Sequence, residues 1–249
     1  MARYEENRGD LGSAPTQDSQ LYPETDGKPM AASDEHRRVL MNLLRLLETF
    51  FAQTPDTYVS GDILMYYLEG DPRKVVSPDV LVTFGIGQKL RKTYRVWQEG
   101  KTPDFVLELS SETTYRNDLG EKMELYAMLG IPEYFLADIE GLYLPTPLMG
   151  FRLVDGVYEP VPPGREGEVH ASVLGLDFHL RFREIQLYDP ARDQWLQLPE
   201  EAAEARADQE ASRAEHAETR AEHAETRAEQ AETEAAALRA ELARLRGNP

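Results

Sequence analysis

Short runs of apolar residues, separated by polar turns, predict a mixed α/β domain in the middle of the chain. Val80 to Phe84 and Phe105 to Leu109 are rich in β-branched and aromatic residues and are bounded by Pro, Gly and Asp, as buried strands are. Apolar positions then recur at helical spacing until Gly130, in a helix that Asn117 or Asp118 can cap. Ile131 to Asp138 predicts a third buried strand, so the stretch is expected to form a strand–helix–strand unit with a parallel strand pair.

A helix and two strands are expected before this unit. Ser33 can cap a helix that carries one apolar stripe and stops at Pro55. Tyr58 to Leu68 alternates loosely and predicts a strand, and Lys74 to Phe84 predicts a long strand that runs back. Pro78 interrupts ladder pairing, so we expect a bulge or a sheet edge at that point.

Further strands, which carry no evident candidate for a functional residue, are expected after the strand–helix–strand unit. Asp155 and Gly156 separate two apolar runs and are a strong signal for a two-residue hairpin. Leu176 to Arg183 and Ile185 to Tyr188 predict a further pair of strands. We interpret these segments as extra β-hairpins packed on the first unit.

The C-terminal segment follows a strict seven-residue period from about residue 211. Its two inward heptad positions are filled by Ala214, Ala217, Ala221, Ala224, Ala228, Ala231, Ala235, Leu238, Leu242 and Leu245. Arginine recurs at one flanking position and glutamate at the other, an arrangement that allows ion pairs between two parallel helices. The pattern favours a coiled-coil homodimer, although alanine propensity and charge pairs along one helix also support a solvated single helix.

Composition limits the domain organisation and the class of protein. The 249 residues fit a flexible N-terminal arm over 1–32, one domain over 33–198 and a charged, alanine-rich helix over 199–249. The chain has no cysteine and five scattered histidines, so a disulfide framework is excluded and a zinc site is not expected. No apolar run is long enough to span a membrane, and we expect a cytoplasmic protein.

A formal net charge of −18 argues against a protein that coats DNA through a large basic face, but it leaves room for a local basic site. The densest basic stretch contains Lys89, Arg91, Lys92 and Arg95, interleaved with Tyr94 and Trp97. Such a stretch could contact phosphates and stack bases. An ordinary amphipathic loop explains the same residues equally well.

Three charged residues in the central part of the chain are candidate catalytic residues. Asp79 opens the first strand, Glu108 lies inside the second, and Lys122 falls on or beside the inward stripe of the helix. A carboxylate within an apolar strand is costly to bury unless a metal ion or a lysine meets it. Two such carboxylates supply the oxygen ligands that Mg²⁺ (or Mn²⁺) needs, and a nearby ammonium can stabilise a phosphodiester transition state. Taken alone, Asp79 has the simpler interpretation of a turn residue.

The strings S-P-D-V-L-V, T-P-D-F-V-L-E-L-S-S and D-L-G-E-K-M-E-L-Y-A-M-L-G-I-P-E-Y-F-L-A-D resemble the Uma-two group of restriction endonucleases, in the PD-(D/E)XK nuclease superfamily. The resemblance implies a restriction-endonuclease-like α/β (α+β) core with a mixed central sheet flanked by helices. It also implies that Asp79 and Glu108 bind Mg²⁺. The usual lysine would stand two residues after Glu108, where this chain has Ser110, so Lys122 looks like a migrated lysine.

Two other acids have simpler roles. Asp104 also follows a proline, but it lies near the start of the same strand as Glu108 and is expected to shape the turn. Glu48 follows the apolar stripe of the first helix and is expected to be a solvated acid.

The leading hypothesis is a Mg²⁺-dependent endonuclease that hydrolyses DNA phosphodiester bonds and associates through its C-terminal helix. Lys89, Arg91, Lys92 and Arg95 are its candidate nucleic-acid contacts. The alternative is a catalytically silent protein that keeps the nuclease fold and acts as a binding or assembly protein through its coiled coil. Binding of Mg²⁺ and cleavage of DNA distinguish the two.

Overall fold

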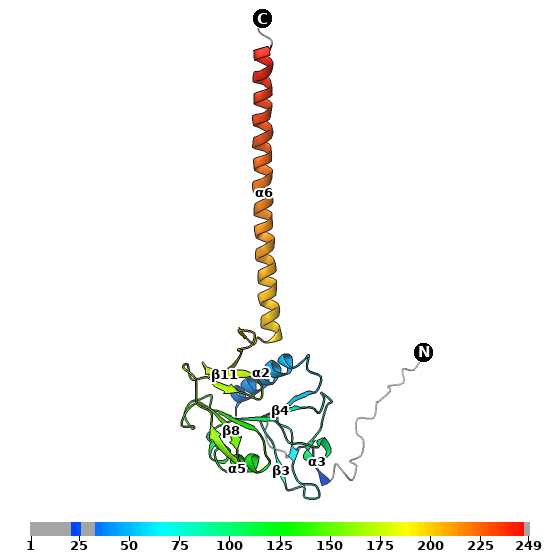
Figure 1. Cartoon of the computed structure of the whole chain (residues 1–249), viewed down its shortest axis with the longest axis vertical. Helices are drawn as coiled ribbons and strands as arrows, with labels where there is room; N and C mark the ends of the chain where they lie inside the picture. The colour runs from blue at the N-terminus through cyan, green and yellow to red at the C-terminus, as the bar shows by residue number, and fades with distance from the viewer. Residues whose placement is uncertain (1–20, 26–32, 247–249) are drawn as a thin grey trace, which may run out of the picture. The chain divides into compact units, whose positions relative to one another are not determined.

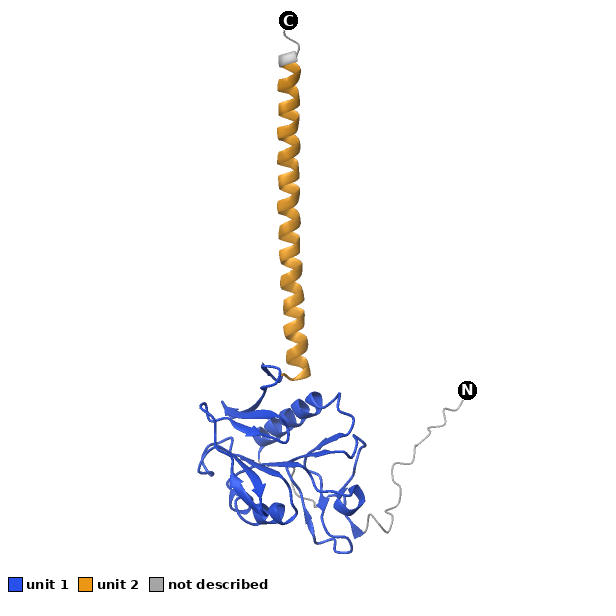
Figure 2. Cartoon of the chain, viewed as in Figure 1, with its two compact units in different colours: residues 1–196 blue, residues 197–249 orange. Residues whose placement is uncertain are grey.

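The computed structural model describes residues 21–25 and 33–246 and divides the chain into two compact units, 1–196 and 197–249 (Figures 1 and 2). Most of the expected N-terminal arm, residues 1–20 and 26–32, therefore lies outside the described residues. Among the helices of the described part, none combines the length and the apolar character that a membrane span requires.

A six-stranded mixed sheet forms the centre of the first unit (Figure 1). Its strands, in spatial order, are β1 (Thr57–Ser60), β4 (Val80–Phe84), β6 (Phe105–Leu109), β7 (Glu133–Ala137), β8 (Leu148–Val154) and β9 (Val157–Pro160). The pair β6 and β7 is parallel, and all other neighbours in this sheet are antiparallel. The predicted mixed α/β class and the predicted parallel pair are both confirmed.

The two faces of this sheet have different partners. In β6, which is buried at all five positions, Val106 belongs to a cluster with Tyr126 and Tyr134. The opposite face carries Phe105, which stacks on Phe178 with ring centroids 5.5 Å apart. Phe178 lies in a second, antiparallel sheet of β10 (Val169–Ala171), β11 (Leu176–Arg181), β12 (Glu184–Asp189) and β13 (Gln194–Trp195). Glu108 therefore lies two residues from Val106 on the helix-covered face.

Helices begin and end mostly where the sequence indicates. The first, α2 (Asp34–Phe50), is capped by Ser33, whose hydroxyl accepts the N–H of His36 at 3.2 Å, and it packs against β1 and β12. A short helix, α3 (Val96–Glu99), follows later in the chain. The single helix expected from about residue 117 is divided into α4 (Tyr115–Asp118) and α5 (Glu121–Met128), with Gly120 at the N-cap of α5.

The strands predicted over Tyr58–Leu68 and Lys74–Phe84 are each broken in two. A small third sheet contains β2 (Met65–Tyr66), β3 (Val75–Val76) and β5 (Tyr94–Arg95), while β1 and β4 remain in the central sheet. At the first break Asp62 has a φ of 50°, and its N–H donates to the carbonyl of Pro78 at 3.1 Å. This hydrogen bond joins the turn between β1 and β2 to Pro78, just before β4. The turn therefore helps to position the start of β4.

Residues 21–25 pack against the third sheet. Tyr22 is 5% exposed, and its ring lies 5.0 Å from that of Tyr66 and 5.3 Å from that of Trp97. Its hydroxyl accepts the N–H of Gly70 at 2.8 Å. The part of the expected arm that the structure describes is thus anchored to the domain.

The remaining expectations concern a hairpin and the last helix. The hairpin at Asp155 and Gly156 is confirmed, because both residues have a positive φ, 48° and 84°, and join β8 to β9. The described residues of the second unit form one helix, α6 (Pro199–Arg246), of 48 residues. Its pairing with a second chain stays a prediction.

Candidate active site

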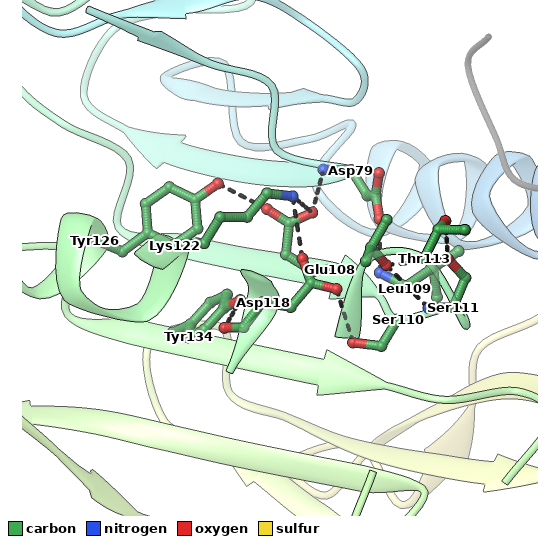
Figure 3. Close-up of polar contacts among 11 residues, drawn as sticks. Asp79, Glu108, Leu109, Ser110, Ser111, Thr113, Asp118, Lys122, Tyr126 and Tyr134 are labelled. Carbon is green, nitrogen blue, oxygen red and sulfur yellow. Dashed lines mark hydrogen bonds and ion pairs between the residues drawn. The ribbon is translucent and has the colours of Figure 1, made fainter. Parts of the chain in front are cut away.

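Two carboxylates meet where β4 and β6 lie side by side. The antiparallel register pairs Val80 with Leu107, so the position before Val80, Asp79, lies opposite Glu108. The backbone N–H of Asp79 donates to Oε2 of Glu108 at 3.3 Å, and the N–H of Leu109 donates to Oδ2 of Asp79 at 2.7 Å (Figure 3). The acids are 29 residues apart in sequence and become neighbours through strand pairing alone.

Helix α5 adds an ammonium and a hydroxyl to the same point. Nζ of Lys122 lies 2.8 Å from Oε2 of Glu108, and the Lys122 side chain is 17% exposed. The hydroxyl of Tyr126 donates to the other oxygen, Oε1, at 2.7 Å (Figure 3). The structure therefore brings together Asp79, Glu108 and Lys122, the three residues selected from the sequence.

A fourth charged residue, Asp118, belongs to this cluster and was missed. The sequence suggested Asn117 or Asp118 as a helix cap, but Gly120 holds that position and Asp118 is 1% exposed. The hydroxyl of Ser110 donates to Oδ2 of Asp118 at 3.0 Å, and Oδ1 lies 3.3 Å from Nζ of Lys122. Its spacing of four residues before Lys122 was a usable signal, since such residues are neighbours on a helix.

Burial controls the electrostatics of the cluster. Loss of solvation raises the pKa of Asp79 to about 6 and that of Glu108 to about 8, although the Lys122 ammonium acts in the opposite direction on both. Burial disfavours the ammonium too, but the three nearby carboxylates prevail and raise the pKa of Lys122. The site is thus short of positive charge, and Lys122 remains a cation at neutral pH.

A cavity of about 1070 Å³ opens beside this cluster. Asp62, Asp79, Asp118 and Lys122 line it together with His36, and part of its wall comes from residues 21 and 23–25. Glu108 is not among the lining residues, since Lys122 and Tyr126 cover it and leave it 1% exposed. A ligand in the cavity therefore meets the ammonium before it meets this carboxylate.

The donor set fits a divalent cation held mainly by water. Within residues 21–25 and 33–246, no three Asp, Glu, His or Cys side chains converge as metal ligands. Mg²⁺, however, commonly binds through one or two carboxylates and keeps several waters. Burial raises the pKa of Asp79 and Glu108 despite the nearby ammonium, and a divalent cation beside them would favour their ionised forms.

The two arginines of the predicted basic patch have buried side chains. Arg91 has a side chain 3% exposed, 2.8 Å from Glu99 and 4.0 Å above the ring of Tyr58. Arg95 is 9% exposed and lies 4.7 Å above the ring of Tyr22. Both guanidinium groups are therefore part of the packing of the domain and do not form an exposed surface for nucleic acid.

The two lysines of the patch are exposed but paired with acids. The side chains of Lys89 and Lys92 are 65% and 80% exposed. Lys89 lies 3.4 Å from Glu99, and Lys92 lies 3.0 Å from Glu24. Of the four candidate contacts, only these two present their charge to solvent.

The two acids set aside from the sequence lie outside the cavity lining. Asp104 accepts the N–H of Phe84 at 2.7 Å and lies 2.8 Å from Lys101, as a residue that shapes a turn would. Glu48 is exposed on α2.

Comparison with known proteins identifies the family. A model of the Uma2 family, described as "Putative restriction endonuclease", matches residues 15–183. No curated protein matches the chain. A crystal structure described as a "putative nuclease belonging to DUF820" from Anabaena variabilis is similar, with 13% identity and a TM-score of 0.44 over 61% of this chain and 81% of that chain. Since the family model spans more than half of its length, the chain belongs to the Uma2 family of restriction-endonuclease-type proteins.

Proposed function

We propose that the chain is a metal-dependent endonuclease that hydrolyses phosphodiester bonds of DNA. The observation that carries this proposal is the junction of Asp79, Glu108 and Lys122 beside a large cavity. Two carboxylates from adjacent strands can bind a metal ion, and an ammonium from the following helix can stabilise the charge that develops in phosphodiester hydrolysis. Membership of the Uma2 family supports the same reaction class.

The three residues have two roles in this proposal, metal binding and charge stabilisation. Asp79 and Glu108 would hold Mg²⁺ or Mn²⁺, which, when bound, lowers the pKa of a coordinated water and neutralises charge on the phosphate. The nearby carboxylates raise the pKa of Lys122 and favour its protonated form, which suits electrostatic stabilisation better than a role as general base. Its ammonium instead stabilises the negative charge that develops on the phosphate oxygens. Tyr126 holds Glu108 in place through its Oε1.

The test is nicking of supercoiled plasmid DNA in the presence of Mg²⁺. The native chain should nick the plasmid, and Glu108→Ala should lose activity by at least about a hundredfold, as expected for loss of a group that stabilises the transition state. Glu48→Gln removes one exposed acid from α2 and serves as the control, with activity like that of the native chain. Equal nicking by the native chain and Glu108→Ala would refute the assignment.

A second candidate is a nuclease-fold protein that no longer cleaves and acts by association. The observation that favours it is helix α6, on which Leu238 and Leu242 are 55% and 52% exposed at inward heptad positions. This candidate predicts that Mg²⁺ neither raises the melting temperature nor supports cleavage. It also predicts that removal of residues 202–249 abolishes self-association, which would then be the measurable activity.

A further inference from the structure

The position two residues after Glu108 connects to Lys122 through Asp118. Ser110 occupies this position, is fully buried, and donates its hydroxyl to Oδ2 of Asp118 at 3.0 Å. The other oxygen of that carboxylate, Oδ1, lies 3.3 Å from Nζ of Lys122 (Figure 3). Ser110, Asp118 and Lys122 thus form a continuous polar chain that ends at Glu108.

The middle residue of this polar chain, Asp118, has one carboxylate oxygen without a hydrogen bond. Oδ1 of Asp118 is buried and accepts no hydrogen bond of good geometry, although it faces the ammonium. A buried carboxylate oxygen that accepts no hydrogen bond lowers the stability of the fold, so a role for Asp118 Oδ1 should be sought. The residue itself is held firmly, because Ser110 fixes Oδ2 and the hydroxyl of Tyr134 donates to the Asp118 carbonyl at 2.9 Å.

The ammonium of Lys122 currently occupies the place that a cation would need. Oε2 of Glu108 accepts both the N–H of Asp79 and the ammonium, which is nearer to it, at 2.8 Å, than to Asp118, at 3.3 Å. Two cations cannot share one carboxylate oxygen at contact distance without strong repulsion. An ammonium that left Glu108 without another acceptor would become an unpaired buried charge, which is a severe penalty.

We propose that Asp118 is a positioning residue that offers the Lys122 ammonium a second acceptor, to which the ammonium moves when Glu108 coordinates a divalent cation. The inference rests on the proposed function, because it requires a cation at Glu108. In this arrangement Lys122 stays paired and charged beside the reacting phosphate, and Asp118 binds neither metal nor substrate. Ser110 keeps Asp118 oriented through the hydrogen bond from its hydroxyl to Oδ2.

Calorimetric titration of the full chain with Mn²⁺ tests the inference through a double-mutant cycle. Asp118→Asn should weaken Mn²⁺ affinity by about tenfold while Lys122 is present, and by less than about twofold in a Lys122→Met background, because the two residues act as one unit. Glu124→Gln removes an exposed acid from the same helix and should leave the affinity as in the native chain. Circular dichroism establishes that each variant is folded.

Crystals of the native chain soaked with Mn²⁺ give an independent measurement that needs no variant. Nζ of Lys122 should lie closer to Oδ1 of Asp118 than its 3.3 Å in the metal-free chain, and it should no longer contact Oε2 of Glu108. Plasmid nicking should show a lower kcat for Asp118→Asn with KM for DNA unchanged, and Asp118→Glu should restore part of the rate.

Four results would overturn the inference. The first is that Asp118→Asn weakens Mn²⁺ affinity equally with Lys122 present and in the Lys122→Met background. Asp118 would then act on the ion without Lys122, either as a ligand or through its charge. The second is an ammonium that stays on Glu108 in the soaked crystals. The third is an Asp118→Asn variant that behaves like Glu124→Gln while the native chain binds Mn²⁺ and cuts DNA, and in that case the proposed function survives. Absence of Mn²⁺ binding by the native chain would refute both.

Discussion

At the scale of single residues, the site gathers three acids around one ammonium, two of them buried and one, Asp79, half-buried. Asp79, Glu108 and Asp118 all lie near Lys122, and burial raises the pKa of the first two. A proton and a divalent cation relieve this excess of negative charge in the same way, so they compete for the same oxygens. Stability and metal binding should therefore both depend on pH.

The metal-free protein should lose stability as the pH rises. A carboxyl whose pKa is higher in the folded than in the unfolded state contributes stability that is complete below its unfolded pKa and lost as the pH rises through its folded pKa. For Glu108 this window runs from about 4.5 to about 8. The free energy of unfolding, measured with urea in the presence of EDTA, should fall less between pH 5 and pH 8 for Glu108→Gln than for the native chain.

Metal should reverse that loss in the native chain. At pH 8, Mg²⁺ should raise the free energy of unfolding of the native chain more than that of Glu108→Gln, because the variant lacks one of the two carboxylates that would bind the ion. An identical pH dependence in both proteins would contradict the assignment of the titrating group to Glu108.

A separate acid, Asp138, should stabilise the loop that follows β7. Its buried carboxylate accepts the backbone N–H groups of Glu140, Gly141, Tyr143 and Leu144, at 2.6–3.1 Å. Burial acts to raise the pKa of Asp138, but these four hydrogen bonds outweigh it and lower the pKa. Asp138→Ala should therefore cost about 1–3 kcal/mol, because backbone donors lose their acceptor.

The sign of the pH effect distinguishes Asp138 from the site acids. A carboxyl with a lowered pKa contributes stability that is present above its unfolded pKa of about 3.8 and lost as the pH falls. The difference in unfolding free energy between the native chain and Asp138→Ala should thus be constant at neutral pH and shrink below pH 4. A difference that persists undiminished into acid would contradict this role.

Sequence reasoning found three of the four charged site residues, for a physical reason. Glu108 stands out because it interrupts an apolar run, Asp79 because it opens one, and Lys122 because it falls on or beside an inward helical stripe. Asp118 was missed because a polar residue just before a helix is usually a cap, and the division into α4 and α5 is not visible in the pattern. The pairing of Asp79 with Glu108 needed the strand register.

At the scale of elements, continuous apolar strands were predictable and interrupted ones were not. The bounds of β6 agree with the predicted run, Phe105 to Leu109, because all five positions are buried. Tyr58–Leu68 reads as one strand, yet Gly61 and Asp62 turn the chain so that β1 and β2 enter different sheets. That turn is required by contact with Pro78 and Asp79, which no local pattern reveals.

Gly61→Ala should damage both stability and the site. A methyl group at Gly61 would collide with the carbonyl oxygen of Asp79 and with the side chain of Leu44, so the backbone of Asp79 must shift. Overpacking of this kind costs about 1–3 kcal/mol. We expect that loss in urea unfolding, together with weaker Mn²⁺ binding in calorimetric titration.

Gly150→Ala is the matched control for that variant. A methyl group at Gly150 would collide with Val169 and with the ring of Phe135, in a part of the domain that contributes no residue to the cavity. It should lower stability by a similar amount and leave Mn²⁺ affinity unchanged. Equal affinity losses in both alanine variants would show that the effect of Gly61→Ala is general destabilisation.

The basic segment gives a second contrast between neighbouring residues. Arg91→Ala should cost about 3–5 kcal/mol, because it leaves the buried Glu99 carboxylate without its main partner. Lys92→Ala, at an 80% exposed side chain, should change stability by less than about 0.5 kcal/mol. Thermal or urea unfolding measures the stability loss of each variant. If Arg91→Ala were as stable as Lys92→Ala, Arg91 would not be part of the packed domain, and the interpretation of an exposed basic patch would stand.

At the scale of the whole molecule, the open question is what stabilises α6. A helix of 48 residues extends about 72 Å at 1.5 Å per residue. Alanine propensity and side-chain hydrogen bonds such as Arg220 to the His216 carbonyl support it locally. A seam of alanines buries little area on association, so a dimer would depend on its leucines, Leu238 and Leu242 among them.

Leu238→Glu should therefore convert a dimer to a monomer. A charge at an inward heptad position faces its copy across a parallel seam, and its desolvation opposes association. Analytical ultracentrifugation should show a dimer for the native chain and for Ala236→Glu, which adds the same charge at an outward position, but a monomer for Leu238→Glu. The variant should also lose helical signal in circular dichroism while the domain keeps its melting temperature. A native chain that is monomeric and fully helical at high concentration would mean that alanine propensity alone maintains α6, and the assembly candidate would lose its physical basis.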